Sequence, residues 1–236
     1  MNGVRTQEIE CYDPKQDQWH ISLLKLNKPL SSLSSVSDEN GVYICGGSDG
    51  QVQSQLYHLN IKKDEWTILP DMINKREEFG FVLGEDKNLF AIGGFNGKQC
   101  LKLCEKFKIN TEEWVSICQL KEPRRSFCAV TLPDGIYAIG GHDGTGYLSS
   151  CERYDYKLNR WVLIKPLHHA RCTLAGVSSP DCRYIYVMGG YDGSAVGLVE
   201  RFDAQKGNWE FIEPMKLKRF MHSACLLALP ECKELV

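Results

Sequence analysis

Glycines that follow an apolar run are the first residues in this sequence that could do chemistry. The stretch "AIGGHDGTG" at residues 138–146 holds four glycines, and a glycine-rich loop can cradle a phosphate group. Such a loop needs a fixed glycine spacing and a following helix whose backbone N–H groups face the anion. The stretch fits neither G-x-G-x-x-G nor G-x-x-x-x-G-K-[ST], so its spacing argues against nucleotide binding.

Cysteine and histidine are the next candidates, because both side chains ligate metals. Cys100 and Cys104 stand on a predicted strand roughly 13 Å apart, at about 3.3 Å per residue, which is too far for one zinc ion. Of the six histidines, His168, His169 and His222 lie near the starts of predicted strands, where we expect solvated loop residues. We therefore predict no metal and no cofactor, with reduced thiols among the eleven cysteines.

Composition excludes several classes of function. Lys and Arg number 28 against 30 Asp and Glu, a net charge of -2, so we expect no nucleic-acid partner. No apolar run is long enough for a membrane helix, and the first ten residues lack the apolar core of a signal peptide. The expected location is cytoplasmic, with cytoskeletal or ciliary association left open.

A repeat of 47 to 49 residues organises the chain, as the positions of paired glycines show. Five tryptophans have the same period, and each stands seven residues after a Tyr, Phe or Leu. The repeated residues are Gly46, Gly47, Gly93, Gly94, Gly140, Gly141, Gly189 and Gly190, together with Trp19, Trp66, Trp114, Trp161 and Trp209. The pattern predicts one domain over 1–236, with repeats near 1–26 (partial), 27–72, 73–120, 121–167, 168–215 and 216–236 (a partial strand completing a blade).

Each repeat predicts four short antiparallel strands. Segments such as "SFCAVTL" and "GIYAIGG" are rich in apolar and aromatic residues and are separated by Pro-Asp or Asp-Gly turn signals. A four-stranded sheet cannot bury both faces alone, so the copies must stack, and radial stacking into a propeller protects the strand edges. We expect the Gly-Gly pairs to form tight turns between packed blades, with a neighbouring tryptophan filling the space.

The repeated motif has four copies, "YICGGSDG", "FAIGGFNG", "YAIGGHDG" and "YVMGGYDG", each followed by the aromatic residue and the tryptophan. This motif resembles that of the kelch family of β-propellers. The resemblance covers nearly the whole chain. It implies an all-β propeller of about five repeats, or part of a six-bladed ring, with four-stranded blades and "GG" ending the second strand. Kelch proteins commonly close by placing a carboxyl-terminal strand, here "HSACLLAL" at 222–229, into the first blade.

Charged residues repeat as well. An arginine precedes the first strand of a repeat, and a glutamate stands two residues before the third-strand aromatic. The two lie 28 or 29 residues apart, and we expect them to pair within a blade. One repeat has Leu30 and Tyr57 at these two positions, which is expected if removing one partner alone leaves a buried charge uncompensated. The pairs are Arg76 with Glu105, Arg124 with Glu152, Arg171 with Glu200 and, if the two ends share a blade, Arg219 with Glu10.

Two sets of loops should emerge on one face, where a rigid scaffold presents them for binding. The loops after the second strands offer Ser48, Phe95, His142 and Tyr191, and the loops before the first strands offer Glu77, Arg125, Cys172 and Phe220. Arg125, the second arginine of "EPRRSFC", resembles the doubled arginine with which several kelch substrate receptors contact acidic peptides, and its planar fork suits a carboxylate.

These residues favour a non-enzymatic module that binds a protein or peptide, with an acidic partner as one option. No G-x-S-x-G elbow supports a catalytic triad. The resemblance implies the substrate-recognition propeller of a cullin-type ubiquitin ligase adaptor, whose BTB and BACK domains do not occur in this sequence. A scaffold propeller on cytoskeletal or axonemal partners is the alternative, and an enzyme of the galactose-oxidase or sugar-epimerase type is a third class.

Overall fold

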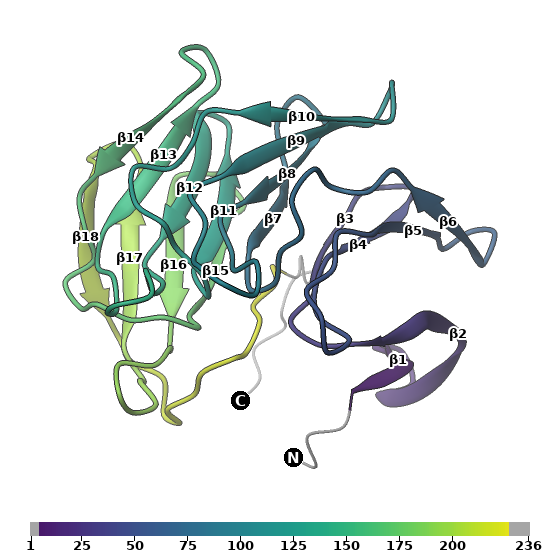
Figure 1. Ribbon diagram of the computed structural model, residues 1–236. Helices are drawn as coiled ribbons and strands as arrows, with labels where there is room; N and C mark the ends of the chain where they lie inside the picture. The colour runs from purple at the N-terminus through teal and green to yellow at the C-terminus, as the bar shows by residue number, and fades with distance from the viewer. Residues whose placement is uncertain (1–4, 227–236) are drawn as a thin grey trace. The chain divides into compact units, whose positions relative to one another are not determined.

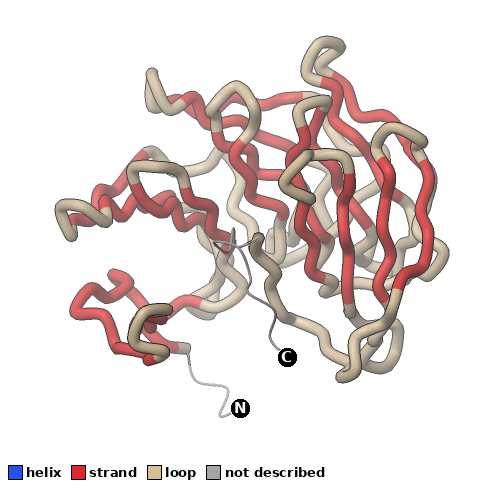
Figure 2. The backbone as a smooth tube through the Cα atoms, turned by 180° about the vertical axis from the view of Figure 1, so that it is seen from behind, coloured by secondary structure: helices blue, strands red, loops and turns tan. Residues whose placement is uncertain are grey.

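The computed structural model describes residues 5–226, and every regular element among them is a strand (Figures 1 and 2). Four sheets have four antiparallel strands each, joined in chain order, and a fifth sheet has two strands. The prediction of an all-β fold with four strands per repeat is therefore confirmed.

We name the four-stranded sheets A to D in chain order. Sheet A contains β3 (Ser34–Ser37), β4 (Gly41–Cys45), β5 (Leu56–Asn60) and β6 (Glu65–Leu69), and sheet B contains β7 (Gly80–Leu83), β8 (Leu89–Ile92), β9 (Cys104–Lys108) and β10 (Glu113–Ile117). Sheet C contains β11 (Cys128–Leu132), β12 (Gly135–Ile139), β13 (Cys151–Asp155) and β14 (Arg160–Ile164), and sheet D contains β15 (Ala175–Ser178), β16 (Tyr184–Met188), β17 (Val199–Asp203) and β18 (Asn208–Ile212).

The first repeat forms a hairpin of β1 (Thr6–Asp13) and β2 (Gln18–Leu30), in which Tyr12 is paired with Trp19. β2 continues through Leu30, beyond the expected end of this repeat at residue 26. At the other end, residues 222–226 are not in a strand, and the rest of "HSACLLAL" and the segment 230–236 lie outside the described residues. The closing strand therefore stays a prediction.

The turn between the third and fourth strands has one recurring cause. A carboxylate or amide at the end of the third strand accepts hydrogen bonds from backbone N–H groups two and three residues later, as Asp155 does from Lys157 and Leu158 at 3.0 Å. Such Asx turns reverse the direction of the chain. The same arrangement occurs at Asp13, Asn60 and Asp203.

The chain divides into two compact units, Met1–Arg125 and Ser126–Val236, and each is described by itself. In the first unit, side chains of sheets A and B, among them Tyr43, Leu56, Phe81 and Phe107, form one core. In the second unit, Tyr137 of sheet C and Phe202 and Trp209 of sheet D belong to an equivalent core. Each sheet thus buries a face that it could not bury alone.

Candidate interaction surface

The four Gly-Gly pairs end the second strand of each sheet in a left-handed backbone. Gly140 and Gly141, for example, have φ angles of 63° and 108°. A Cβ atom on Gly47 would stand 2.7 Å from the carbonyl oxygen of Ser31, so only glycine fits there. The second glycine of each pair donates its N–H, at 2.8–3.0 Å, to the carbonyl oxygen of the next repeat's arginine: Gly47 to Arg76, Gly94 to Arg124, Gly141 to Arg171 and Gly190 to Arg219.

The expectation that tryptophan fills the space beside these glycines is wrong. A Cβ atom on Gly46 would meet the Arg76 carbonyl oxygen and the Phe79 and Met72 side chains. The tryptophans instead lie on the outermost strand or, for Trp19, on the hairpin. In sheet B, Trp114 packs on Phe107 with ring centroids 5.2 Å apart. Its indole N–H reaches the preceding repeat and donates to the Pro70 carbonyl at 2.8 Å, as Trp209 does to Lys165 at 2.9 Å.

The repeated arginines and glutamates form buried ion pairs in sheets B and D. Arg76 bonds Glu105 through Nη2, and Arg171 Nη1 lies 2.7 Å from Glu200 Oε1, with all four side chains 0% exposed. Arg76 also donates to the carbonyl oxygens of Gly93 and Leu103 at 2.6 and 2.9 Å. Each arginine therefore joins its side chain to its own sheet and its carbonyl group to the preceding Gly-Gly turn.

The remaining members of this set differ in burial. Arg124 and Glu152 are fully buried, and the Leu30 and Tyr57 side chains that replace the pair in sheet A are also buried. Arg219 and Glu10 are exposed and belong to different units, so their pairing stays a prediction.

The two sets of loops meet in sheets A, B and D. Glu77, after the repeated arginine, forms a backbone bridge to Phe95, after the Gly-Gly pair, with N···O distances of 2.9 Å in both directions. Ser31 bridges Ser48 and Cys172 bridges Tyr191 in the same way. The loops that the sequence singled out therefore lie side by side in sheets A, B and D.

In the first unit, Arg125 is the centre of the surface. Its guanidinium carbon lies 5.0 Å from the Phe95 ring centroid, and Nη1 lies 3.7 Å from Glu78 Oε2. The Arg125 and Glu78 side chains are 33% and 30% exposed, so a partner can reach both. Burial is the main cause that raises the pKa of Glu77, and the charge of Glu78 adds to it.

The expectation that Ser48 contacts a partner is wrong. Ser48 is 7% exposed and its hydroxyl accepts the Gly50 N–H, so it offers little contact area.

In the second unit the surface is aromatic. Phe220 lies 5.2 Å from Tyr191, Tyr191 lies 6.1 Å from Tyr147, and Tyr147 lies 5.4 Å from His142, measured between ring centroids. Tyr147 and Phe220 are 38% and 43% exposed, while the Cys172 side chain is buried. Sequence reasoning missed Tyr147 because it considered only the residue directly after Gly-Gly; the second aromatic of "GGHDGTGY" was the available signal.

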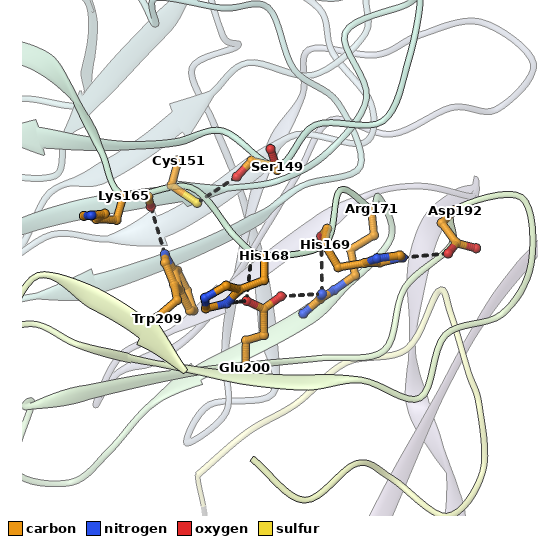
Figure 3. Close-up of polar contacts among 9 residues, drawn as sticks. All are labelled: Ser149, Cys151, Lys165, His168, His169, Arg171, Asp192, Glu200 and Trp209. Carbon is orange, nitrogen blue, oxygen red and sulfur yellow. Dashed lines mark hydrogen bonds and ion pairs between the residues drawn. The ribbon is translucent and has the colours of Figure 1, made fainter. Parts of the chain in front are cut away.

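His168 and His169 lie in a loop with exposed side chains, as expected, and each also contacts a carboxylate. His168 donates its backbone N–H to Glu200 Oε2 at 2.9 Å, and its Nδ1 lies 2.8 Å from the same oxygen (Figure 3). His169 Nε2 lies 2.7 Å from Asp192 Oδ2. That hydrogen bond is the main reason why the pKa of Asp192 is lowered. His222 is half-buried, and burial, with the charge of Arg219, lowers its pKa.

Comparison with known proteins identifies the repeat. The family model described as the KLHDC2/KLHL20/DRC7 Kelch-repeats domain matches residues 32–229. The chain belongs to the kelch-repeat family. Sheets A to D are accordingly kelch blades of the β-propeller fold, and the resemblance drawn from the Gly-Gly motifs is confirmed.

The kelch chain is similar to several curated proteins over about half of its length. Kelch-like protein 25 of Xenopus tropicalis is 24% identical over 113 residues, which are 48% of this chain and 19% of that protein. A RING finger domain and kelch repeat-containing protein of Dictyostelium discoideum is 29% identical over 119 residues, 50% of this chain and 12% of that protein. A kelch repeat and BTB domain-containing protein of Caenorhabditis elegans is 27% identical over 147 residues, 55% of this chain and 24% of that protein. The matches therefore cover less than a quarter of each relative's own length.

Within residues 5–226, no group of three or more His, Cys, Asp or Glu side chains has an arrangement that could hold a metal ion. The same residues contain no helix long and apolar enough to cross a membrane. Cys11, Cys182 and Cys225 are exposed free thiols.

Proposed function

We propose that this kelch chain is a non-catalytic module that binds a protein partner through the loops carrying Phe95, Arg125, Tyr191 and Phe220. The observation that carries the proposal is made in each unit by itself: Arg125 stacks on Phe95 in the first, and the rings of Phe220, Tyr191 and Tyr147 pack in a row in the second. Aromatic residues and arginine dominate the binding energy of protein interfaces. Kelch domains are, as a family, protein-interaction modules, which agrees with this assignment.

Arg125 is the residue through which an acidic partner would bind. The Phe95 ring orients its planar guanidinium group, which presents two parallel donors to a carboxylate. Glu78 occupies one side of the guanidinium at 3.7 Å, a distance that makes a weak exposed pair. A carboxylate of the partner would replace Glu78 in this contact.

The finer proposal is that the propeller recognises substrates for a cullin-type ubiquitin ligase. Two relatives support this proposal, one named for a RING finger domain and the other for a BTB domain. In such an adaptor the propeller selects the substrate, and a separate domain recruits the ligase. The partner of this chain would then be a substrate that is ubiquitylated after binding.

Affinity capture with the protein tests the proposal. We expect the wild type to retain a partner that Tyr191→Ala and Arg125→Ala lose by about 10-fold or more in affinity, the loss typical of an interface hot spot. Leu163→Ala is the matched control, because Leu163 is 61% exposed on β14, outside these loops. Equal affinity of all four proteins would refute binding at this surface.

Glu78→Gln separates the acidic-partner proposal from binding in general. It removes the competing charge beside Arg125, so an acidic partner should bind more tightly, whereas a neutral or basic partner should not. Recovery of a cullin-family subunit together with the partner, and ubiquitylation of that partner, would support the ligase role. Recovery of filament proteins alone would contradict it.

A further inference from the structure

We propose that His169 and Asp192 form a pH-dependent link that holds the Tyr191 loop of sheet D more firmly below neutral pH than above it. The consequence for binding rests on the proposed function, because Tyr191 belongs to that surface. The link itself is a property of the second unit alone and does not require a partner.

The contact joins two loops that are otherwise connected through their backbones. His169 precedes β15, and its Nε2 lies 2.7 Å from Asp192 Oδ2 in the β16–β17 loop (Figure 3). The other oxygen of Asp192 accepts the Ser194 N–H at 3.1 Å, so the carboxylate also shapes its own loop. The loop closes where Val196 donates to the Gly190 carbonyl at 2.9 Å. Securing Asp192 therefore limits opening of the segment between Gly190 and Val196.

The equivalent position of other repeats shows what this side chain does. Two residues before the repeated arginine position stand Lys28, Asn74, Glu122, His169 and Leu217. Lys28 pairs with Asp49 at 3.0 Å, and Asp49 lies in the loop of sheet A as Asp192 does in sheet D. Asn74 instead donates to Glu105 at 2.8 Å. Position 169 thus has a permanently charged counterpart and a neutral counterpart in the same protein.

Histidine changes charge near neutral pH, which makes the sheet D link titratable. The neutral Nε2–H tautomer donates a hydrogen bond to Asp192, and the imidazolium adds an ionic attraction to it. The link is therefore strongest where the imidazole is charged and Asp192 is still ionised, and it weakens when the imidazole loses its proton. Both side chains are accessible, 39% for His169 and 27% for Asp192, so protons exchange freely with solvent.

The charges around His169 come from three elements. Asp192 faces it from the β16–β17 loop, and Lys216 and Lys218 line the same groove from the segment after β18. On its own segment, Arg171 Nη1 donates to the His169 carbonyl oxygen at 3.4 Å, and His168 is bound to Glu200. Of these charged groups, Asp192 is the one in direct contact with the His169 ring.

Hydrogen exchange of the protein, measured by NMR at pH 5.5 and pH 7.5, tests the link without a partner. Protection is expressed relative to the intrinsic exchange rate at each pH. We expect protection of the Val196 amide to rise about two- to fivefold at the lower pH, the range set by an exposed ion pair. His169→Lys, which copies Lys28, should protect Val196 equally at both pH values, and His169→Asn, which copies Asn74, should show no rise.

His168→Ile is the matched control, because Ile73 occupies this position in sheet B and donates its backbone N–H to Glu105 at 2.8 Å, as His168 does to Glu200. This variant should keep the pH response of Val196. Any of three outcomes would overturn the proposal. They are Val196 protection that does not depend on pH in the wild type, a pH response that persists in His169→Asn, and loss of the pH response in His168→Ile. Because no partner is used, these outcomes are independent of the affinity-capture result.

Discussion

Glu105 shows how a buried charge is accommodated in this protein. Its carboxylate accepts the backbone N–H groups of Ile73 and Asn74 at 2.8 and 3.0 Å in addition to the Arg76 guanidinium. Buried charges are tolerated when every lone pair has a donor, and removal of one partner leaves the other uncompensated. The absence of both charges at Leu30 and Tyr57 follows the same rule.

Replacing Arg76 by Leu should destabilise the protein by about 3–5 kcal/mol, the usual consequence of leaving one buried charge unpaired. The double variant Arg76→Leu with Glu105→Tyr copies sheet A and should lose less than the sum of the single variants. Urea unfolding followed by tryptophan fluorescence measures both. Strict additivity of the two single losses would show that the charges do not act as a pair.

Asp143 is a single residue whose contribution to the stability of the fold depends on pH. The Thr145 N–H, then the Thr145 hydroxyl and the Gly146 N–H, lower its pKa to about 2. An aspartate whose pKa is depressed stabilises the fold above its unfolded value of about 3.9, and the contribution disappears as the pH falls through about 2. Carbon-13 NMR titration of the Asp143 carboxyl should give a midpoint near 2, whereas a midpoint near 4 would show that these hydrogen bonds are not kept in solution.

At the scale of the element, a blade is a short meander whose turns place the side chains that matter. The second strand ends at Gly-Gly, the loop returns through a backbone bridge, and the Asx turn reverses the third strand into the fourth. The loops can vary in sequence because the bridges between Glu77 and Phe95 and between Cys172 and Tyr191 are made by the backbone. Binding residues can therefore differ from one blade to the next without loss of the fold.

Substitution of two glycines in one loop distinguishes the effect of backbone strain on stability from the effect of a steric clash. Gly50 has φ of 119° and free space around its Cβ direction, whereas Gly47 has φ of 89° and faces the Ser31 carbonyl oxygen at 2.7 Å. Gly50→Ala should cost about 1–2 kcal/mol from the left-handed backbone alone. Gly47→Ala should cost distinctly more, measured as the loss in unfolding free energy. Equal losses would mean that the close approach to Ser31 contributes nothing.

For the whole molecule, stability comes from contacts between successive repeats rather than from one central element. Within each unit, an arginine carbonyl accepts the N–H of the preceding Gly-Gly pair, and a tryptophan N–H reaches the preceding repeat's backbone. The glycine link recurs in all four blades and the tryptophan link in sheets B and D, as expected of a fold in which each repeat stabilises its neighbours.

Thiol reactivity reports on this packing over the described chain. Burial raises the pKa of Cys104 and of Cys128 to about 12, so neither forms the reactive thiolate at neutral pH. Maleimide labelling followed by peptide mass spectrometry should modify the exposed Cys11, Cys182 and Cys225 in the native protein. Cys104 and Cys128 should react only after denaturation, and their rapid native labelling would contradict the buried cores.

The sequence by itself determined the repeat, the four strands of each blade, the glycine turns and the arginine–glutamate spacing, because these depend on local backbone preference and on one period. Only the tertiary structure decided which side chains form the surface. It buries Ser48, adds Tyr147 to the ring of Tyr191, stacks Arg125 on Phe95 and gives His169 a carboxylate partner. These contacts join loops that lie far apart in the chain, so they depend on how strands and turns pack in three dimensions, which no local pattern specifies.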